Sequence, residues 1–155
     1  MIVRLSLQNP DTVEQLWSLQ HAAYRLEAEA MGLRDVPPLP ETFESIRNSD
    51  EDFYGVLSAD GELLGAIVTA PADTAANTLE ITRLMIHPDH LRKGIGASLL
   101  KHVIDHHPEI RTFAVTAGTH NEPAVSLYRK FGFMPGESVK SIPGAGLTVF
   151  RFHRT

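Results

Sequence analysis

The sequence contains no cysteine, and this absence excludes several kinds of chemistry. Without a thiol the chain has no disulfide, no thiolate metal ligand, no iron–sulfur cluster and no cysteine nucleophile. No run of apolar residues approaches the 18 that would predict a membrane-spanning helix. The amino-terminal residues lack the basic segment and apolar stretch of a signal peptide, so we expect a cytoplasmic protein that does not bind membranes.

Basic residues are scarce in the first half of the chain. Residues 1–80 have a net charge of −10, whereas residues 81–155 have a net charge of +5 and contain seven of the eight histidines. No stripe rich in lysine and arginine exists, and we therefore expect no nucleic-acid ligand. Unless the asymmetry arises by chance, it fits a second half that holds an anion and a first half that tolerates cations.

Length and composition predict a single domain spanning residues 1–155. The 155 residues are 43% hydrophobic and 21% charged, which is typical of a globular protein with one core. Hydrophobic periodicity and turn residues predict seven strands and four helices in the order β-α-α-β-β-β-α-β-α-β-β. This order indicates an α/β fold in which helices flank both faces of a central mixed sheet. We expect strands at 3–7, 53–58, 63–70, 79–87, 111–117, 133–140 and 147–153, and helices at 13–30, 42–48, 94–107 and 122–131.

The strongest local motif is a glycine-containing turn between the expected strand at 79–87 and the helix that follows it. In residues 92–97, Arg-Lys-Gly-Ile-Gly-Ala, glycines let backbone N–H groups approach a phosphate, and the helix amino terminus adds partial positive charge. The chain lacks the Lys-Ser/Thr pair of a P-loop, and Leu99 stands where a dinucleotide fingerprint has its third glycine. A Gly-x-Gly alone is more often a structural turn than a phosphate-binding loop, so the neighbouring motifs are needed to distinguish the two.

The histidines do not form a convincing metal site. His102 and His106 are one helical turn apart, but no HExxH pattern accompanies them, and we expect both on the solvated face of their helix with no bound metal. His87 and His90 flank a turn, where a surface role is expected. The chain also lacks the GxSxG motif of a serine hydrolase.

Two motifs together resemble the GNAT superfamily of N-acetyltransferases. The first is Ile86-His-Pro-Asp-His-Leu-Arg-Lys-Gly-Ile-Gly96, and the second is Asn121-Glu-Pro-Ala-Val-Ser-Leu-Tyr-Arg-Lys-Phe-Gly-Phe133. The resemblance is close over residues 79–133 and looser before them. It implies the acyl-coenzyme A N-acyltransferase fold and acetyl-coenzyme A as cosubstrate.

The resemblance also implies roles for individual residues. The backbone of one strand segment would bind the pantetheine arm and acetyl carbonyl, a loop would bind the pyrophosphate, Asn121 would contact the coenzyme, and the Tyr128 hydroxyl would protonate the departing sulfur. Asn121 can also cap its helix, and Tyr128 can instead be a core tyrosine. The strand segment comprises Leu84, Met85 and Ile86, and the loop comprises Arg92, Lys93, Gly94, Ile95, Gly96 and Ala97.

One position departs from the family pattern, and the general base is not fixed by the motif. Leu91 occupies a position where the family usually has Gln or Arg, so the loop backbone, Arg92 and Lys93 must bind the phosphates. Glu80 matches the catalytic glutamate of the histone acetyltransferase branch. An even offset of four residues predicts that it shares a strand face with Leu84. The alternatives are a solvated or ion-paired carboxylate, with water chains acting as the base.

We expect direct transfer of an acetyl group from acetyl-coenzyme A to a primary amine of a small molecule or peptide. The alternatives are a catalytically weak module that senses coenzyme A, and an acyl donor other than acetyl. A cationic acceptor is favoured by acidic residues in and after the first helix, although they can equally form a solvated face. These acidic residues are Glu27, Glu29, Asp35, Glu41, Glu44, Asp50, Glu51 and Asp52. The two strands that close the sheet could also pair with a second copy of the chain, so a homodimer is one possible assembly.

Overall fold

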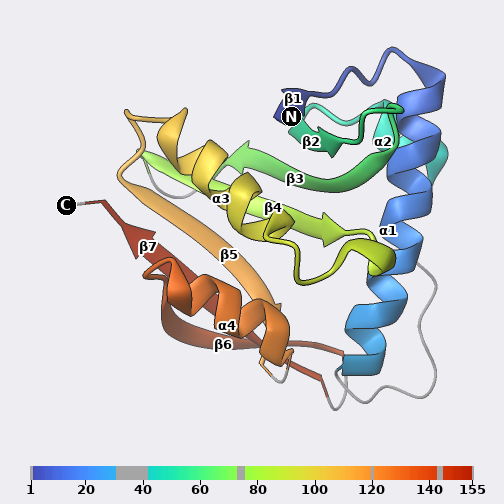
Figure 1. The fold of residues 1–155 in the computed structure, drawn as a ribbon. Coiled ribbons are helices and arrows are strands. Elements are labelled where there is room, and N and C mark those ends of the chain that lie inside the picture. Colours follow the sequence, from blue (N-terminus) through green and yellow to red (C-terminus); the bar gives the residue numbers. More distant parts are fainter. Residues whose placement is uncertain (1, 31–41, 73–75, 120, 143–144, 155) are drawn as a thin grey trace.

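Seven strands form one mixed sheet in the computed structural model, which describes residues 2–30, 42–72, 76–119, 121–142 and 145–154. The order across the sheet is β1-β2-β3-β4-β5-β7-β6, and neighbouring strands are antiparallel except for the parallel pair β4–β5 (Figure 1). The short strand β1 is therefore an edge strand. The strands are β1 (Ile2–Arg4), β2 (Asp52–Leu57), β3 (Leu63–Pro71), β4 (Thr78–Ile86), β5 (Thr112–Gly118), β6 (Met134–Ile142) and β7 (Ala145–His153).

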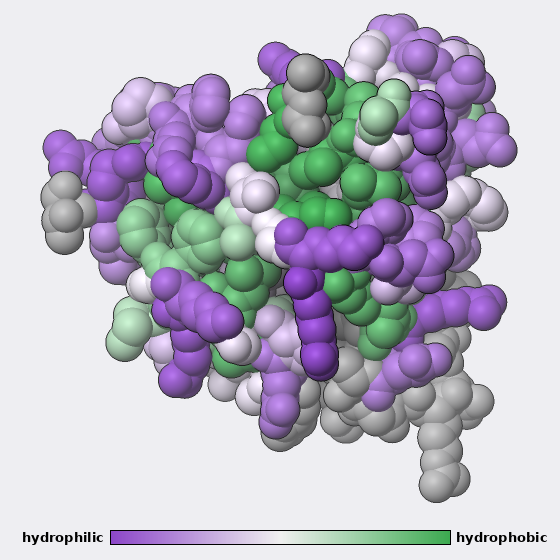
Figure 2. Space-filling model, viewed as in Figure 1, coloured by the Kyte–Doolittle hydropathy of each residue, from purple (hydrophilic) through white to green (hydrophobic). Residues whose placement is uncertain are grey.

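Helices pack on both faces of the sheet, and each face has its own apolar core. Helices α3 (Ile95–Asp105) and α4 (Glu122–Lys130) pack over one core, and we call their side the α3/α4 face. Helices α1 (Pro10–Ala30) and α2 (Phe43–Arg47) pack over the second core, on the α1/α2 face. Figure 2, viewed as in Figure 1, shows hydrophilic residues around a smaller apolar region in the upper middle, over β2 and β3.

Alternation along the strands assigns side chains to the two faces. In β5, Phe113, Val115 and Ala117 belong to the α3/α4 core, so the intervening residues face the other way. In β3, Ala66 and Val68 belong to the α1/α2 core, whereas Ile67 lies in the α3/α4 core. The few polar residues of β3 follow from this position, because both of its faces are covered.

Most elements start and stop within two residues of their predicted bounds; α1 begins three residues early, at Pro10, and there are two further exceptions. Thr42 and Ser45 form a reciprocal capping box at the start of α2, and Gly61 takes φ +82° in the turn between β2 and β3. The first exception is β1, which was expected to reach residue 7 but ends at Arg4, because Ser6 accepts the hydrogen bonds of a turn that leads into α1. The second is a 3-10 turn, η1 (Pro88–His90), in a segment expected to be a loop.

None of the helices in the described part of the chain is long and apolar enough to cross a membrane.

Candidate active site

Strands β4 and β5 pair at one end and then diverge. Their parallel pairs run from Thr78↔Thr112 to Ile81↔Val115. Beyond Ile81, β4 continues to Ile86 with only β3 as its described partner, and β5 continues to Gly118 with only β7 (Figure 1). Backbone groups of residues 82–86 that point toward β5 are therefore left outside the sheet ladder. This segment contains Leu84, Met85 and Ile86, whose backbone the resemblance implied would bind the pantetheine arm and acetyl carbonyl.

A β-bulge lies in β4 at the point of divergence. Val68 of β3 pairs with Arg83 and the next residue, Thr69, pairs with Ile81, so Thr82 is the extra residue. An extra residue reverses the alternation of all the residues that follow it. The two cores show this reversal. Before the bulge, the odd-numbered Leu79 and Ile81 lie in the α3/α4 core. After it, the even-numbered Leu84 and Ile86 pack there, and the odd-numbered Met85 lies in the α1/α2 core.

The bulge corrects the predicted relation between Glu80 and Leu84. Glu80 lies between two residues of the α3/α4 core, so its side chain is on the α1/α2 face, while Leu84 packs on the α3/α4 face. An even offset gives a common face only along a regular strand, and the bulge removes that regularity. The expectation that the two residues share a face was wrong, whereas the role of Glu80 as a base stays a prediction.

The loop before α3 has the geometry of an anion site. Arg92 and Gly94 take φ values of +62° and +79°, and a Cβ added to Gly94 would meet no atom within 4 Å. Gly94 is the N-cap of α3 and supplies no side-chain hydrogen bond, so the helix presents its first N–H groups and its partial positive charge to the exposed side. Arg92 and Lys93 are exposed beside it. Lys93 Nζ lies 3.3 Å from His90 Nδ1. Leu91 is 44% exposed.

Gly96 has a packing role that the sequence did not reveal. It is buried in the first turn of α3, where an added Cβ would lie 3.0 Å from Leu127 Cδ2 of α4 and 3.7 Å from Ile86 Cδ1. Gly96 therefore lets α3, α4 and the end of β4 approach one another. Ile95 and Ala97 beside it are half-buried. Of the two glycines, Gly94 is the one that faces open space.

Helix α4 carries the other two residues that the resemblance singled out. Asn121 is the N-cap of α4, but its side chain makes no capping hydrogen bond. Tyr128 is 5% exposed and packs against Phe133 and Phe150, with ring centroids 5.8 Å and 6.0 Å away. Phe150 is paired with Val115, the last residue of β5 that meets β4. Tyr128 thus lies on the α3/α4 face at the level where the strands diverge.

On the α1/α2 face, Glu80 lies in a row of small and charged residues. Its neighbours across the sheet are Ala70 of β3 and Ala114 of β5, and Ala114 is paired with Arg151 of β7. Glu80 is exposed and forms no ion pair among the described residues. Arg151 binds both carboxylate oxygens of Glu137, at 2.7 and 2.5 Å, and lowers the pKa of that carboxyl to about 2. Its charge is thereby largely balanced.

A further carboxylate, Glu51, reaches the bulge from the residue before β2. Thr82 Oγ1 donates a short hydrogen bond to Glu51 Oε2 and also lies 3.3 Å from the Val68 carbonyl oxygen. The Glu51 N–H donates to Ser49 Oγ at 3.1 Å. The sequence placed Glu51 only within an acidic group. Its contact with β4 joins segments 31 residues apart, and no local pattern predicts it.

The acidic group of the first half does not act as one patch. Asp52 binds Arg4 at 2.6 Å, and Glu51 binds Thr82. Asp35 and Glu41 lie outside the described residues, as does the side chain of Glu27. A pocket of about 460 Å³ near β1 is lined by Asp50, Glu51 and Asp52 together with Arg4 and Arg47, so both basic and acidic side chains line it.

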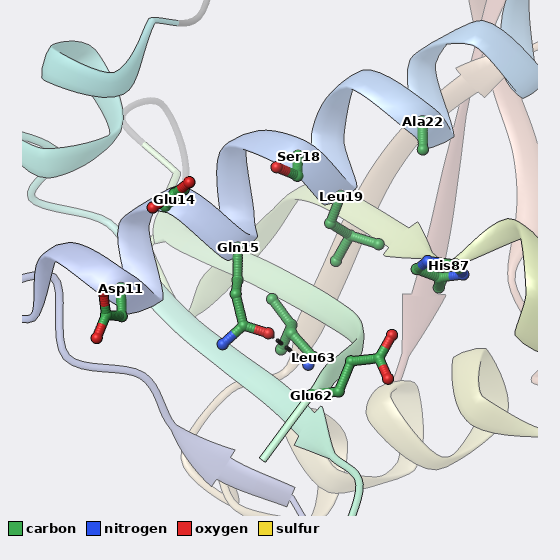
Figure 3. Close-up of a pocket in the computed structure, with 9 residues that line it drawn as sticks. All are labelled: Asp11, Glu14, Gln15, Ser18, Leu19, Ala22, Glu62, Leu63 and His87. Carbon is green, nitrogen blue, oxygen red and sulfur yellow. Dashed lines mark hydrogen bonds between the residues drawn. The ribbon is translucent and has the colours of Figure 1, made fainter. Parts of the chain in front are cut away.

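A second pocket, of about 380 Å³, lies between α1 and the start of β3 (Figure 3). In the close-up, Glu62 and His87 point toward each other across it, and Gln15 Oε1 accepts the Leu63 N–H at 2.8 Å. His87 directly follows β4, so this pocket adjoins the end of the diverging strand and not the point of divergence. Its lining residues are Asp11, Glu14, Gln15, Ser18, Leu19, Ala22, Glu62, Leu63 and His87.

The two histidines of α3 differ in their surroundings. The His102 ring is half-buried, 5.5 Å from the ring of Tyr54, and it stacks on His106 at 3.9 Å. Burial, and then the neighbouring His106 and His107, lower the pKa of His102. The expectation of a solvated face holds for His106 and is wrong for His102. No group of three potential ligands for a metal ion occurs among the described residues.

Comparison with known proteins is consistent with this geometry. The model of the acetyltransferase (GNAT) family matches residues 13–133, which is most of the chain. The chain belongs to the GNAT acetyltransferase family. It is 37% identical over 153 residues to the UPF0157 protein YqkA of Bacillus subtilis, although it spans only 43% of the length of that protein.

Solved structures support the same fold. The ribosomal-protein-S18-alanine N-acetyltransferase of Escherichia coli superposes with a TM-score of 0.76 at 15% identity, over 99% of this chain and 92% of that one. The PaiA N-acetyltransferase of Thermoplasma acidophilum, solved in complex with coenzyme A, superposes with a TM-score of 0.68 at 22% identity, over 98% of both chains. At these identities the GNAT chain shares a fold with them, and nothing follows about its substrate.

Proposed function

We propose that this GNAT domain transfers an acetyl group from acetyl-coenzyme A directly to a primary amine in a ternary complex. The observation that carries the proposal is the opening between β4 and β5, with Tyr128 on one face and Glu80 on the other at the point of divergence. An acyl group held in that opening is accessible from both faces of the sheet. Family membership supports acyl transfer, and these two residues support an amine as the acceptor.

The residues of the chain fit an acyl-coenzyme A. The uncapped amino terminus of α3, the open space at Gly94 and the exposed Arg92 and Lys93 suit a pyrophosphate. The backbone of Leu84 to Ile86, which is unpaired on the side of β5, suits the amides of a pantetheine arm. The Asn121 side chain makes no capping hydrogen bond and suits a contact near that arm. When bound, the cosubstrate supplies a thioester, which is an activated acyl donor with a thiolate as leaving group.

Two residues of the chain would move the protons. Glu80 accepts a proton from the acceptor ammonium, directly or through water, because only the free amine has the lone pair that attacks the acyl carbon. As the C–N bond forms and the C–S bond breaks, the Tyr128 hydroxyl donates a proton to the departing sulfur. The attacking nitrogen loses a second proton to solvent as the amide forms, and Glu80 and Tyr128 return to their starting states by proton exchange with solvent. The products are an acetylated amine and free coenzyme A.

The acceptor side of the site favours a cation. Among the described residues in the row of Glu80, the charge of Arg151 is balanced by Glu137, while Glu80 has no ion pair. A small-molecule amine or a peptide amine with positive charge would be attracted to this face. We also propose a cytoplasmic location and keep a homodimer through the closing strands as a prediction.

An acceptor screen with labelled acetyl-coenzyme A tests the proposal. The panel covers polyamines, amino acids, aminoglycosides and peptides, and both labelled amine and free thiol are measured. We expect transfer to at least one amine class with equal release of thiol. Coenzyme A binding without transfer to any amine would favour the coenzyme-sensing alternative instead.

A further inference from the structure

Strand pairing brings Glu51 next to β4, a position that its place in the sequence does not suggest. Glu51 precedes β2, at the far side of β3 from the opening. Asp52 pairs with Thr69 and Ala70 pairs with Glu80, so extending the register by one residue puts Glu51, Ala70 and Glu80 in one row. The row lies on the α1/α2 face, and two strand spacings put the Glu51 and Glu80 backbones about 10 Å apart. The alanine between them leaves room above the sheet.

Glu51 is held in place from two directions. The Thr82 hydroxyl donates to one of its carboxylate oxygens, and its own N–H donates to Ser49 Oγ at 3.1 Å. Thr82 follows Ile81 of the α3/α4 core, so alternation puts its side chain on the α1/α2 face, where it reaches Glu51. The second carboxylate oxygen of Glu51 accepts no other hydrogen bond within the described part of the chain. A half-buried carboxylate fixed in this way is a rigid acceptor for a charged donor.

The charges facing this part of the sheet leave an excess of negative charge. Arg151 is bound by Glu137 and Arg4 by Asp52, and Arg83 has an interaction of its own. Arg47 lines the same pocket as Glu51, but Asp50 lines it too and offsets that charge, so Glu51 and Glu80 remain as the excess. Both carboxylates are next to the residues where β4 and β5 diverge. A ligand that satisfies both must carry two positive donor groups.

We propose that Glu51 is a specificity-determining residue that binds the second ammonium group of a diamine acceptor, while the first ammonium lies at Glu80 and the opening. This inference rests on the proposed acetyl transfer to amines and deepens it by naming the substrate class. The amine at Glu80 loses its proton and attacks the acyl group. The ammonium at Glu51 keeps its proton and fixes the orientation of the acceptor. A monoamine of the same length lacks that second contact.

The test compares 1,4-diaminobutane with butylamine at saturating acetyl-coenzyme A. In Glu51→Gln, which keeps the side-chain shape, we expect kcat/KM for the diamine to fall by about tenfold, mainly through KM, which is the loss expected for one charge-assisted hydrogen bond. Butylamine should change by less than about twofold, because it does not reach Glu51. Glu109→Gln, an exposed carboxylate between α3 and β5, is the matched control and should leave both amines unchanged.

A second pair of variants keeps the test independent of the folding of Glu51→Gln. Thr82→Val removes the hydroxyl that holds Glu51 and should also lower the diamine-to-monoamine ratio, whereas Thr82→Ser keeps the hydroxyl and should preserve it. If Glu51→Gln and Thr82→Val affect both amines equally, or neither, the role of Glu51 is wrong and amine acetylation still stands. If the unmodified protein acetylates no amine, the proposed function itself fails, and this inference fails with it.

Discussion

Tyr128 packs against Phe150, with ring centroids 6.0 Å apart, in the row of the sheet where β4 and β5 diverge. Phe150 pairs with Val115, and Val115 pairs with Ile81, the last residue of β4 that meets β5. The tyrosine therefore reaches the divergence from the α3/α4 face, one residue beyond the position of Glu80 on the opposite face. Groups that could donate and accept a proton thus flank the same opening.

Replacing Tyr128 with Phe removes the hydroxyl and keeps the ring that packs against Phe133 and Phe150. We expect kcat to fall by about 10²-fold while KM for acetyl-coenzyme A changes little, because general acid catalysis acts in the transition state and not in coenzyme binding. Steady-state kinetics with a good amine acceptor measures both constants. Tyr54→Phe is the control, since Tyr54 lies on β2 beside His102 and away from the opening. A kcat for Tyr128→Phe within twofold of the original would assign Tyr128 to the core alone.

Replacing Glu80 with Gln removes the candidate base without changing its shape. The rate should fall most at low to neutral pH, where the acceptor amine is protonated and must lose a proton before it attacks. At high pH the amine is already free, and the variant should approach the activity of the original protein. The measurement is kcat/KM against pH for both proteins. An unchanged profile would mean that solvent or another group is the base.

Gly94 offers a cleaner test of the anion site than Gly96 does. Val at position 96 would disturb the packing of α3 on Leu127, whereas a methyl group at position 94 points into open space. Gly94→Ala should weaken coenzyme A binding by at least about tenfold, or about 1.4 kcal/mol, because it obstructs the phosphate and strains a backbone with φ +79°. Calorimetric titration with coenzyme A measures the affinity.

Gly61 provides the matched control for this substitution. It has φ +82° and equally open surroundings, but it lies in the turn between β2 and β3. Gly61→Ala should carry a similar backbone cost of about 1–2 kcal/mol and leave the coenzyme affinity unchanged. Equal loss of affinity in the two variants would show that strain, and not phosphate contact, explains the effect at Gly94.

Attraction of a cationic acceptor should depend on salt. The Debye length falls from about 10 Å at 0.1 M salt to about 3 Å at 1 M, so steering by exposed charges fades over this range. We expect kcat/KM to fall steeply for an acceptor with two positive groups and much less for a monoamine. A best acceptor that is neutral or anionic, with kcat/KM independent of salt, would refute a cationic acceptor.

The fold was largely predictable because its signals are local. The β2–β3 turn follows from Asp60-Gly61, the start of α2 from the Thr42 capping position, and the stop after α4 from Gly132 with φ +92°. The parallel pairing of β4 and β5 follows from the helix between them. The end of β1 was less predictable, because Ser6 can continue a strand or accept turn hydrogen bonds.

The site was predictable only in part, because its arrangement depends on contacts between distant segments. The motifs located the loop at Gly94 and the helix that carries Tyr128. The bulge at Thr82 follows from the pairing of β4 with β3 and has no local signature, so periodicity alone misplaced Glu80 relative to Leu84. The contact of Thr82 with Glu51, 31 residues away in sequence, depends on the pairing of β3 with both β2 and β4.

Hydrogen exchange with and without acetyl-coenzyme A tests the central claim most directly, which is that the opening between β4 and β5 holds the acyl donor. Backbone amides that lie outside the sheet ladder or in the first turn of a helix exchange readily unless a ligand binds them. We predict that acetyl-coenzyme A protects segments 82–86 and 93–97, while β2 and the β2–β3 turn exchange as before. Protection confined to other segments, or no protection at saturating acetyl-coenzyme A, would contradict the account.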